Sequence, residues 1–237
     1  HIYTYTRACV TGGADNLVAM ARLMWDTGGV YSVSDVCSGY PRGQVHEDFT
    51  EVAKFADSTA IGDVVKRAFL LHFGKPVTLC DAGGKPITKM INGYAQGGTL
   101  DALMFQLGMK QRLEGAAATA LGERCEKTAN NPQAIPGSYI DDTGIAAKSM
   151  DSWCEYFRHV ADDFEPKDNQ IICSSLTRQE MVDAMRAGGV NPDTFPVIVG
   201  KPERGSEPAG IVVLGVPVGN EEFLEQYATS KTGDLGD

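Results

Sequence analysis

Two adjacent carboxylates, Asp141 and Asp142, follow an apolar run and precede a turn-forming pair in the stretch Ser138-Tyr139-Ile140-Asp141-Asp142-Thr143-Gly144. Adjacent side chains on a strand point to opposite faces, so both acids can approach one cation only where the strand ends and the backbone turns. We expect Thr143-Gly144 to supply that turn. The arrangement indicates a metal site, although a hairpin with two solvated acids is the commoner interpretation of Asp-Asp-Thr-Gly by itself.

A third acid, Asp35, follows the alternating apolar and polar residues of Val30-Tyr31-Ser32-Val33-Ser34. Alternation of this kind predicts a half-buried strand, which places Asp35 at a strand tip. Together with Asp141 and Asp142 it would give three carboxylates, the hard oxygen ligands that magnesium prefers. Two magnesium ions held in this way can activate a hydroxyl and stabilise the leaving oxygen of an in-line phosphoryl transfer. Without the Asp141-Asp142 pair, Asp35 would instead be interpreted as a cap of the following loop.

Four segments of the chain form an ordered set that includes these acids. The first, Asp35 to Tyr40, has an aromatic residue five positions after its acid, and the second, Gly93 to Phe105, is a glycine-rich turn that leads into helical spacing. The third is Tyr139-Ile140-Asp141-Asp142, and the fourth is the apolar stretch Val213 to Gly219. In this order they resemble the palm of a reverse transcriptase of the non-LTR retrotransposon and group II intron type, in which the fourth segment is the strand that grips the primer end.

The resemblance implies an α/β (α+β) polymerase palm, with an antiparallel sheet backed by helices, part of the fingers and little or no thumb. It implies a single domain over residues 1–237. Residues 1–28 and 48–75 would be its helical palm and fingers portion, 76–173 the catalytic core, and 174–237 the C-terminal palm with the primer-grip-like strand. The positions at which the chain starts and stops suggest a fragment of a retroelement polyprotein.

The activity that the resemblance implies is RNA-templated DNA synthesis by two-metal catalysis. Asp35, Asp141 and Asp142 would be catalytic, with Asp35 and Asp141 as the main metal ligands and Asp142 assisting them. Together with the carbonyl of Val36 they would bind two Mg²⁺ ions, for which Mn²⁺ is a substitute. The implied partners are an RNA template, a DNA primer, deoxynucleoside triphosphates, and fingers, thumb or other polyprotein domains outside this chain. No membrane partner is expected, because the sequence has no apolar run long enough to span a bilayer. We expect an intracellular location.

Three further residues would contact the substrate. By resemblance Tyr40 lies under the incoming sugar, where its ring would collide with a 2′-hydroxyl, although core packing is an equal alternative. Gln96 would lie near the templating base pair, or else serve as a structural amide bonded to a loop carbonyl. Gly97, with no side chain, allows the backbone to approach a base or phosphate closely. Downstream, the lysine of the family is represented either by Lys167 out of register or by Asp168 in register.

The negative net charge of the chain argues against a polymerase function. A polymerase must hold a polyanion and normally has a basic surface, yet this chain has 31 acidic and 21 basic residues. The alternative function is therefore a degenerate, non-catalytic palm that serves as an interaction or scaffold module. A third possibility is an acidic domain whose Asp-Asp turn binds calcium structurally, but no dense loop of oxygen ligands accompanies it. The six cysteines include no Cys-x-x-Cys pair, so neither a zinc site nor a disulfide framework is expected.

Periodicity and turn residues predict the elements that position these groups. Helices are expected over Ala14–Asp26, over 48–73 with a break near Ser58, from Gly98 to about Glu114, over Trp153–Phe164 and over Arg178–Ala187. Strands are expected at Val77–Cys80, Pro86–Met90, Gln170–Cys173, Pro196–Val199 and Gly210–Leu214. Residues 115–136, rich in small and turn residues, are expected to be a poorly packed connection.

Overall fold

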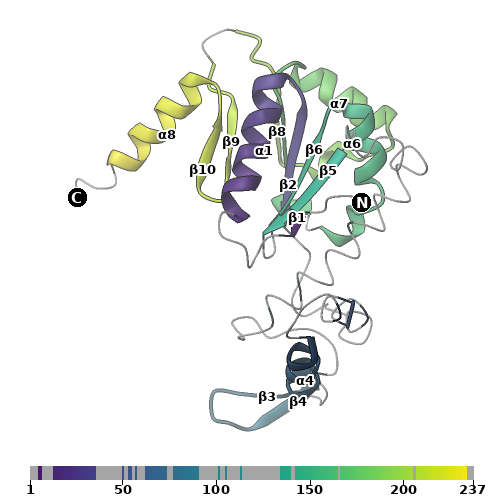
Figure 1. Ribbon diagram of the computed structural model, residues 1–237. Coiled ribbons are helices and arrows are strands. Elements are labelled where there is room, and N and C mark those ends of the chain that lie inside the picture. The colour runs from purple at the N-terminus through teal and green to yellow at the C-terminus, as the bar shows by residue number, and fades with distance from the viewer. Residues whose placement is uncertain are drawn as a thin grey trace. The chain divides into compact units, whose positions relative to one another are not determined.

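A computed structural model describes residues 5–6, 13–35, 50, 53–54, 57, 62–73, 77–90, 101, 105, 113, 134–139, 142–164, 166–204 and 207–233 (Figure 1). The chain divides into two compact units. One, here called the sheet unit, comprises His1–Val36 and Leu113–Asp237, and the other, the hairpin unit, comprises Cys37–Arg112. Five residues predicted to form the site lie outside the described residues: Val36, Tyr40, Gln96, Gly97 and Asp141.

The sheet unit is built on a six-stranded sheet of order β1-β5-β6-β2-β7-β8. The pairs β1–β5 and β7–β8 are parallel, and the other three pairs are antiparallel. The fold is therefore mixed α/β with a mostly antiparallel sheet, as expected. The strands are β1 (Tyr5–Thr6), β2 (Val30–Asp35), β5 (Ala134–Tyr139), β6 (Asp142–Ala147), β7 (Gln170–Cys173) and β8 (Val197–Val199).

One face of this sheet packs on helix α1 (Gly13–Thr27) and on the hairpin of β9 (Gly210–Val213) and β10 (Val216–Gly219). Gly28, with φ 73, ends α1 in the left-handed conformation that favours glycine. Burial of the apolar residues on this face removes them from water and is the main force that holds the layers together. The core here consists of Leu17, Val18, Ala21, Tyr31, Val33, Ala146, Ile172, Ile211, Val213 and Val218.

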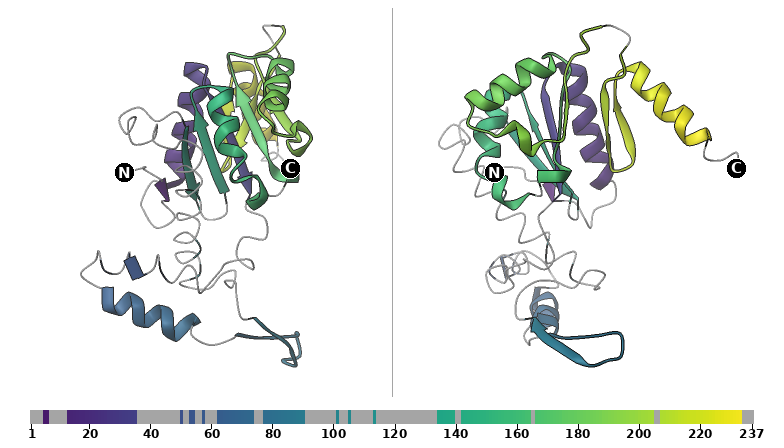
Figure 2. Two further views of the ribbon diagram at one scale, coloured as in Figure 1. Left: turned by 90° about the vertical axis from the view of Figure 1, so that its right-hand side faces the viewer. Right: turned by 180° about the vertical axis from the view of Figure 1, so that it is seen from behind.

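The opposite face is covered by α6 (Met150–Phe157) and α7 (Arg178–Ala187), as Figure 2 shows from two further directions. Short 3-10 helices follow at η1 (Ala161–Asp163), η2 (Pro166–Asp168) and η3 (Pro192–Thr194), and α8 (Glu221–Gly233) follows β10. The rings of Trp153 and Phe157 stack at 4.8 Å, and Trp153 Nε1 donates to Ser32 Oγ at 2.9 Å. A single helix was predicted over Trp153–Phe164. In the structure α6 ends at Phe157, and the 3-10 helix η1 follows it.

The prediction that Thr143-Gly144 forms the turn is wrong. Strand β5 ends at Tyr139 and β6 begins at Asp142, so Thr143 and Gly144 are strand residues that face Ser34 and Val33 of β2. Glycine is required at 144 for packing instead, since a Cβ there would lie 2.2 Å from the hydroxyl oxygen of the buried Tyr31.

The stretch Val213–Gly219, predicted as one strand, is also different. Leu214 and Gly215 have φ 49 and 79 and join β9 to β10 in a two-residue hairpin. Two consecutive positive φ values are the geometry that matches the twist of paired strands in such a hairpin. The segment is therefore a tight hairpin over the sheet and not a single strand.

In the hairpin unit, helix α4 (Gly62–Phe73) precedes the antiparallel strands β3 (Val77–Cys80) and β4 (Pro86–Met90). Asp81 Oδ1 closes the turn by accepting hydrogen bonds from the backbone N–H of Gly83 and of Lys85, both at 2.9 Å. The bounds of this hairpin are those predicted from the sequence. Residues 50, 53, 54 and 57 are also helical, in the segment where a first helix was expected.

Candidate functional site

Asp35 and Asp142 face each other across two neighbouring antiparallel strands. Asp35 is the last residue of β2 and Asp142 the first of β6, and the two are direct register partners. Directly opposite residues in an antiparallel pair have Cβ atoms about 4.5–5.5 Å apart and project from the same face of the sheet. Both acids are half-buried. The predicted opposition of Asp35 to the acidic pair is therefore present for Asp142, while Asp141 lies outside the described residues.

The sequence of β2 explains why its acid is found at this edge. Val30, Tyr31, Ser32, Val33 and Ser34 are all buried, because helices or the β9–β10 hairpin cover both faces of the strand. A charged carboxylate is costly to bury without partners, so it is tolerated only where the strand leaves the core. Asp35 occupies that position, and β6 begins with its acid at the same edge.

The two acids open into one pocket with a cavity volume of about 320 Å³. Its polar wall continues with Lys167 and Asp168 of η2, where Lys167 Nζ lies 3.7 Å from Asp168 Oδ2. Its apolar wall includes Val197 of β8, Val212 of β9 and Leu214 of the β9–β10 turn. Segments far apart in the sequence thus converge on Asp35 and Asp142.

The chemistry of this pocket fits a hard divalent cation. Like charges directly opposite each other on a sheet are destabilising, and a cation between them would remove that repulsion. Carboxylate oxygens are the ligands that Mg²⁺ uses in proteins. Among the described residues no group of three or more His, Cys, Asp or Glu side chains is arranged to hold a metal. Asp35 and Asp142 are candidate ligands only as a pair of register partners.

Tyr31 lies on the same face of β2 as Asp35, four residues before it, and is completely buried. Burial raises the pKa of its phenol far above the ordinary value, and the negative charge of Asp142 raises this pKa further. Its hydroxyl reaches the position where Gly144 lacks a side chain and has no hydrogen-bond partner in the part of the chain described. Tyr31 is consequently a neutral packing group at physiological pH and not an acid or base.

The pocket contains both residues between which the sequence left the lysine position open, and it adds a residue that the sequence analysis missed. Lys167 and Asp168 both line it, so the register question between them has no bearing on which one reaches the site. Gln170, at the start of β7, was not predicted as a site residue. Its only signal in the sequence is its place just after Lys167 and Asp168, and its approach to Asp35 depends on the pairing of β7 with β2.

No protein-family model matches this chain, and no curated protein does. Among the helices that the structure describes, none combines the length and the apolar character needed to cross a bilayer.

Proposed function

We propose that this chain is a polymerase palm that catalyses RNA-templated DNA synthesis. The observation that carries the proposal is the pairing of Asp35 with Asp142 at the ends of adjacent antiparallel strands, inside a pocket that also contains a lysine. The four ordered sequence motifs support the same function, because two of them contribute these acids and a third, Val213 to Gly219, contributes Leu214 beside them.

In this proposal Asp35 and Asp142 hold a divalent cation, with Asp141 and the carbonyl of Val36 as further ligands implied by the motifs. When bound, Mg²⁺ supplies positive charge to the reacting phosphate and lowers the pKa of the attacking hydroxyl. The acids orient this charge toward the pocket, because both stand on strands held rigidly by the buried residues behind them. Rigid placement of such groups is what electrostatic catalysis requires.

The other pocket residues are assigned by their chemistry. The ammonium group of Lys167 contributes a positive charge to the pocket, where it would contact the phosphates of a nucleoside triphosphate. The side chains of Val212 and Leu214 offer an apolar surface for the sugar of the primer end. Tyr40, Gln96 and Gly97 remain assigned by resemblance to the incoming sugar, the templating base pair and the backbone of the substrate, respectively.

Primer extension on an RNA template tests the function. A protein that joins this chain to the implied fingers and thumb, with Mg²⁺ and deoxynucleoside triphosphates, should extend a labelled DNA primer, whereas the isolated chain should show little or no extension. In that larger protein Asp142→Asn should lower the rate at least about 100-fold because it removes a charge that acts on the transition state. Asp183→Asn is the matched control, since Asp183 is an exposed acid on α7 outside the pocket. Equal rates for the wild type and Asp142→Asn would contradict the proposal.

The alternative is a degenerate palm that serves as an interaction or scaffold module. The charge favours it, because 31 acids against 21 bases oppose the binding of a polyanion. If a protein that joins this chain to the implied fingers and thumb folds, binds a protein partner and shows no extension above background in Mg²⁺ or Mn²⁺, the scaffold function replaces the catalytic one.

A further inference from the structure

Four buried polar side chains form a row across the sheet, one residue inward from the two acids and on the opposite face. Ser138 of β5 faces Thr143 of β6, and Thr143 faces Ser34 of β2. The register of β2 with β7 ends at Val33 and Gln170, and Asn169 directly precedes Gln170, at the same end of the sheet as Ser34. We call Ser138, Thr143, Ser34 and Asn169 the polar row.

Three members of the polar row have a polar atom without a protein partner. Ser34 Oγ, Thr143 Oγ1 and Asn169 Oδ1 make no hydrogen bond within the described part of the chain. The exposed fractions of these residues are 1%, 0% and 2%, so bulk water does not reach them. The amide nitrogen of Asn169, by contrast, donates to the carbonyl of Thr194 at 3.1 Å. Unpaired polar groups this deeply buried are rare in native proteins and call for a bound partner.

Apolar surroundings increase the stability that a hydrogen-bond partner would give to these buried polar atoms. The face of the sheet that carries the polar row also carries Ser32, whose hydroxyl accepts a hydrogen bond from Trp153 in an aromatic cluster with Phe157 and Phe195. In surroundings of low polarity an unsatisfied hydroxyl or amide oxygen is costly, and a satisfied one is strengthened. On this face the hydroxyl of Ser32 has a protein partner, in contrast to those of Ser34 and Thr143.

The spacing and the atom types of the row match water. Opposite residues have Cβ atoms about 4.5–5.5 Å apart, and one water with two hydrogen bonds of about 2.8 Å joins oxygens roughly 4.5 Å apart. Each hydroxyl can donate or accept, and Asn169 Oδ1 accepts, so water molecules placed between neighbouring members of the row can satisfy the three atoms. The row contains no carboxylate to compensate a metal cation, which disfavours an ion there.

We propose that the polar row is a binding site for buried water, which links Ser34, Thr143 and Asn169 directly behind the two acids. The bound water joins β2 to β6 one residue from Asp35 and Asp142, and so holds the strand ends together against the repulsion of the two carboxylates. Site-bound water of this kind is part of the folded structure and is costly to remove. The proposal concerns the fold and does not depend on the polymerase assignment.

Urea unfolding of Thr143→Val, Ser34→Ala and the double variant tests the site, because a dry row and a hydrated row predict opposite signs. In a hydrated row each single change lowers the unfolding midpoint, and the double change lowers it by less than the sum, since the water is already lost after the first. In a dry row each change removes an unpaired hydroxyl and raises the midpoint. Raised midpoints in both single variants would overturn the proposal, whether or not the chain proves to be a polymerase.

A crystal structure of the wild type provides the direct observation, with density expected within hydrogen-bond distance of both Ser34 Oγ and Thr143 Oγ1. Ser32→Ala serves as the control for a hydroxyl with a protein partner and should lower the midpoint in either case. The midpoint should be the same in sodium, potassium and choline chloride at equal ionic strength. A midpoint that changes with the cation, or a row empty of density, would contradict a water site.

Discussion

The large ring of Tyr31 packs against Gly144, which has no side chain, near the strand ends that carry Asp35 and Asp142. The ring of Tyr31 occupies the space that a side chain at 144 would need, with its hydroxyl oxygen 2.2 Å and its Cζ 2.8 Å from an added Cβ. Interiors are packed too densely to absorb such an overlap without displacement. Since Asp142 lies two residues from Gly144 on the same strand and face, this packing also fixes the strand that carries the acid.

Gly144→Ala should therefore destabilise the chain by about 1–3 kcal/mol, the usual cost of overpacking a core. Chemical denaturation followed by tryptophan fluorescence measures the effect. In Tyr31→Leu the ring is removed, so adding Gly144→Ala to that variant should cost much less than it does alone. Equal costs of Gly144→Ala in the two backgrounds would show that the ring is not the obstacle.

At the scale of elements, strand and helix identity follow from local pattern, and the errors have tertiary causes. The alternation that ends at Asp35, the turn at Asp81 and the helix over Arg178–Ala187 were all predictable, because the residues that define them are neighbours in sequence. Thr143-Gly144 resembled a turn, but its glycine serves Tyr31 in another strand. Leu214 has a positive φ, which a bulky side chain disfavours, so the sequence around it did not predict a turn at this position.

The pocket was predictable only in part for the same reason. The sequence predicted that Asp35 and Asp141 end neighbouring antiparallel strands; the structure pairs Asp35 with the adjacent Asp142, and Asp141 lies outside the described residues. The contribution of Val212, Leu214 and Gln170 depends on how β9 and β7 pack and pair, and such long-range contacts leave no periodic trace in the sequence. Local sequence patterns thus predict the individual strands and helices, while tertiary packing determines which of their side chains line the pocket.

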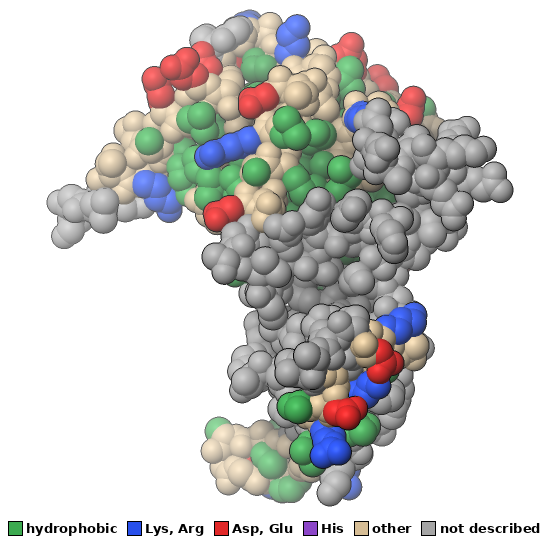
Figure 3. All heavy atoms as spheres, in the orientation of Figure 1, with side chains coloured by type: hydrophobic (Ala, Val, Ile, Leu, Met, Phe, Trp, Pro, Cys, Tyr) green, Lys and Arg blue, Asp and Glu red, His purple; other side chains and the backbone are tan. Residues whose placement is uncertain are grey.

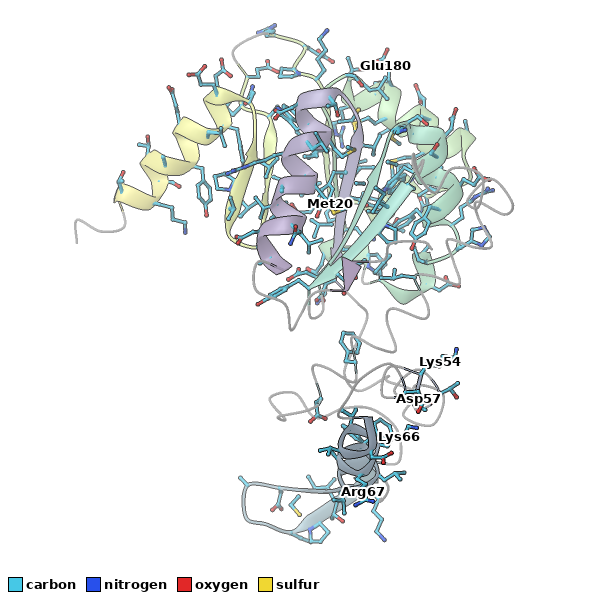
Figure 4. The ribbon with its side chains drawn as sticks, viewed as in Figure 1. Met20, Lys54, Asp57, Lys66, Arg67 and Glu180 are labelled. Atoms are coloured by element: carbon cyan, nitrogen blue, oxygen red, sulfur yellow. The ribbon has the colours of Figure 1, made fainter. Side chains whose placement is uncertain are left out.

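Helix α7 begins with a capping box that makes stability depend on pH. Thr177 Oγ1 accepts from the Glu180 N–H at 3.3 Å, and Glu180 Oε2 accepts from the Thr177 N–H at 2.8 Å, near the Glu180 label in Figure 4. The hydrogen bonds from Thr177 hold the pKa of Glu180 below its usual value. A carboxylate with a lowered folded pKa adds stability above its unfolded pKa, and this stability is lost as the pH falls through the folded value.

Thr177→Ala should lower stability at pH 7 by about 1 kcal/mol, as loss of an N-cap side chain does. The variant should also lose less stability than the wild type between about pH 5 and pH 3, because the cap no longer favours ionised Glu180 as strongly. Urea titrations over this range compare the two proteins. A wild type and variant whose stabilities fall in parallel with pH would show that the box does not couple Glu180 to folding.

At the scale of the whole molecule, charge is distributed unevenly along the chain. Residues 62–90, which contain α4, β3 and β4, have five Lys or Arg and two Asp or Glu, whereas the full chain has 21 and 31. Figure 4 labels Lys66 and Arg67 on α4, where Lys66 pairs with Asp57. On the visible face of the sheet unit, Figure 3 shows acidic and basic side chains scattered without a continuous basic stripe. The 62–90 segment is therefore the candidate contact for a nucleic-acid backbone.

If the chain binds a primer–template, the double change Lys85→Ala and Lys89→Ala should weaken binding and reduce the magnitude of the slope of log K against log salt by about 1–2, since each phosphate contact contributes nearly one unit. Both lysines lie in or beside the exposed β3–β4 hairpin. Fluorescence anisotropy at several salt concentrations gives the slope. Lys231→Ala, on the acid-rich helix α8, is the control and should leave the slope unchanged. A slope unaffected by the hairpin lysines would place the backbone contacts elsewhere.

Binding of Mn²⁺ is the most direct test of the central claim that Asp35 and Asp142 form one divalent-cation site. Titration followed by electron paramagnetic resonance measures the free ion and needs neither template nor substrate. We expect saturable binding by the wild type, competition by Mg²⁺, at least a tenfold loss of affinity in both Asp35→Asn and Asp142→Asn, and no change in Asp183→Asn. Wild-type affinity in either Asp35→Asn or Asp142→Asn would contradict the claim that these two register partners share a metal.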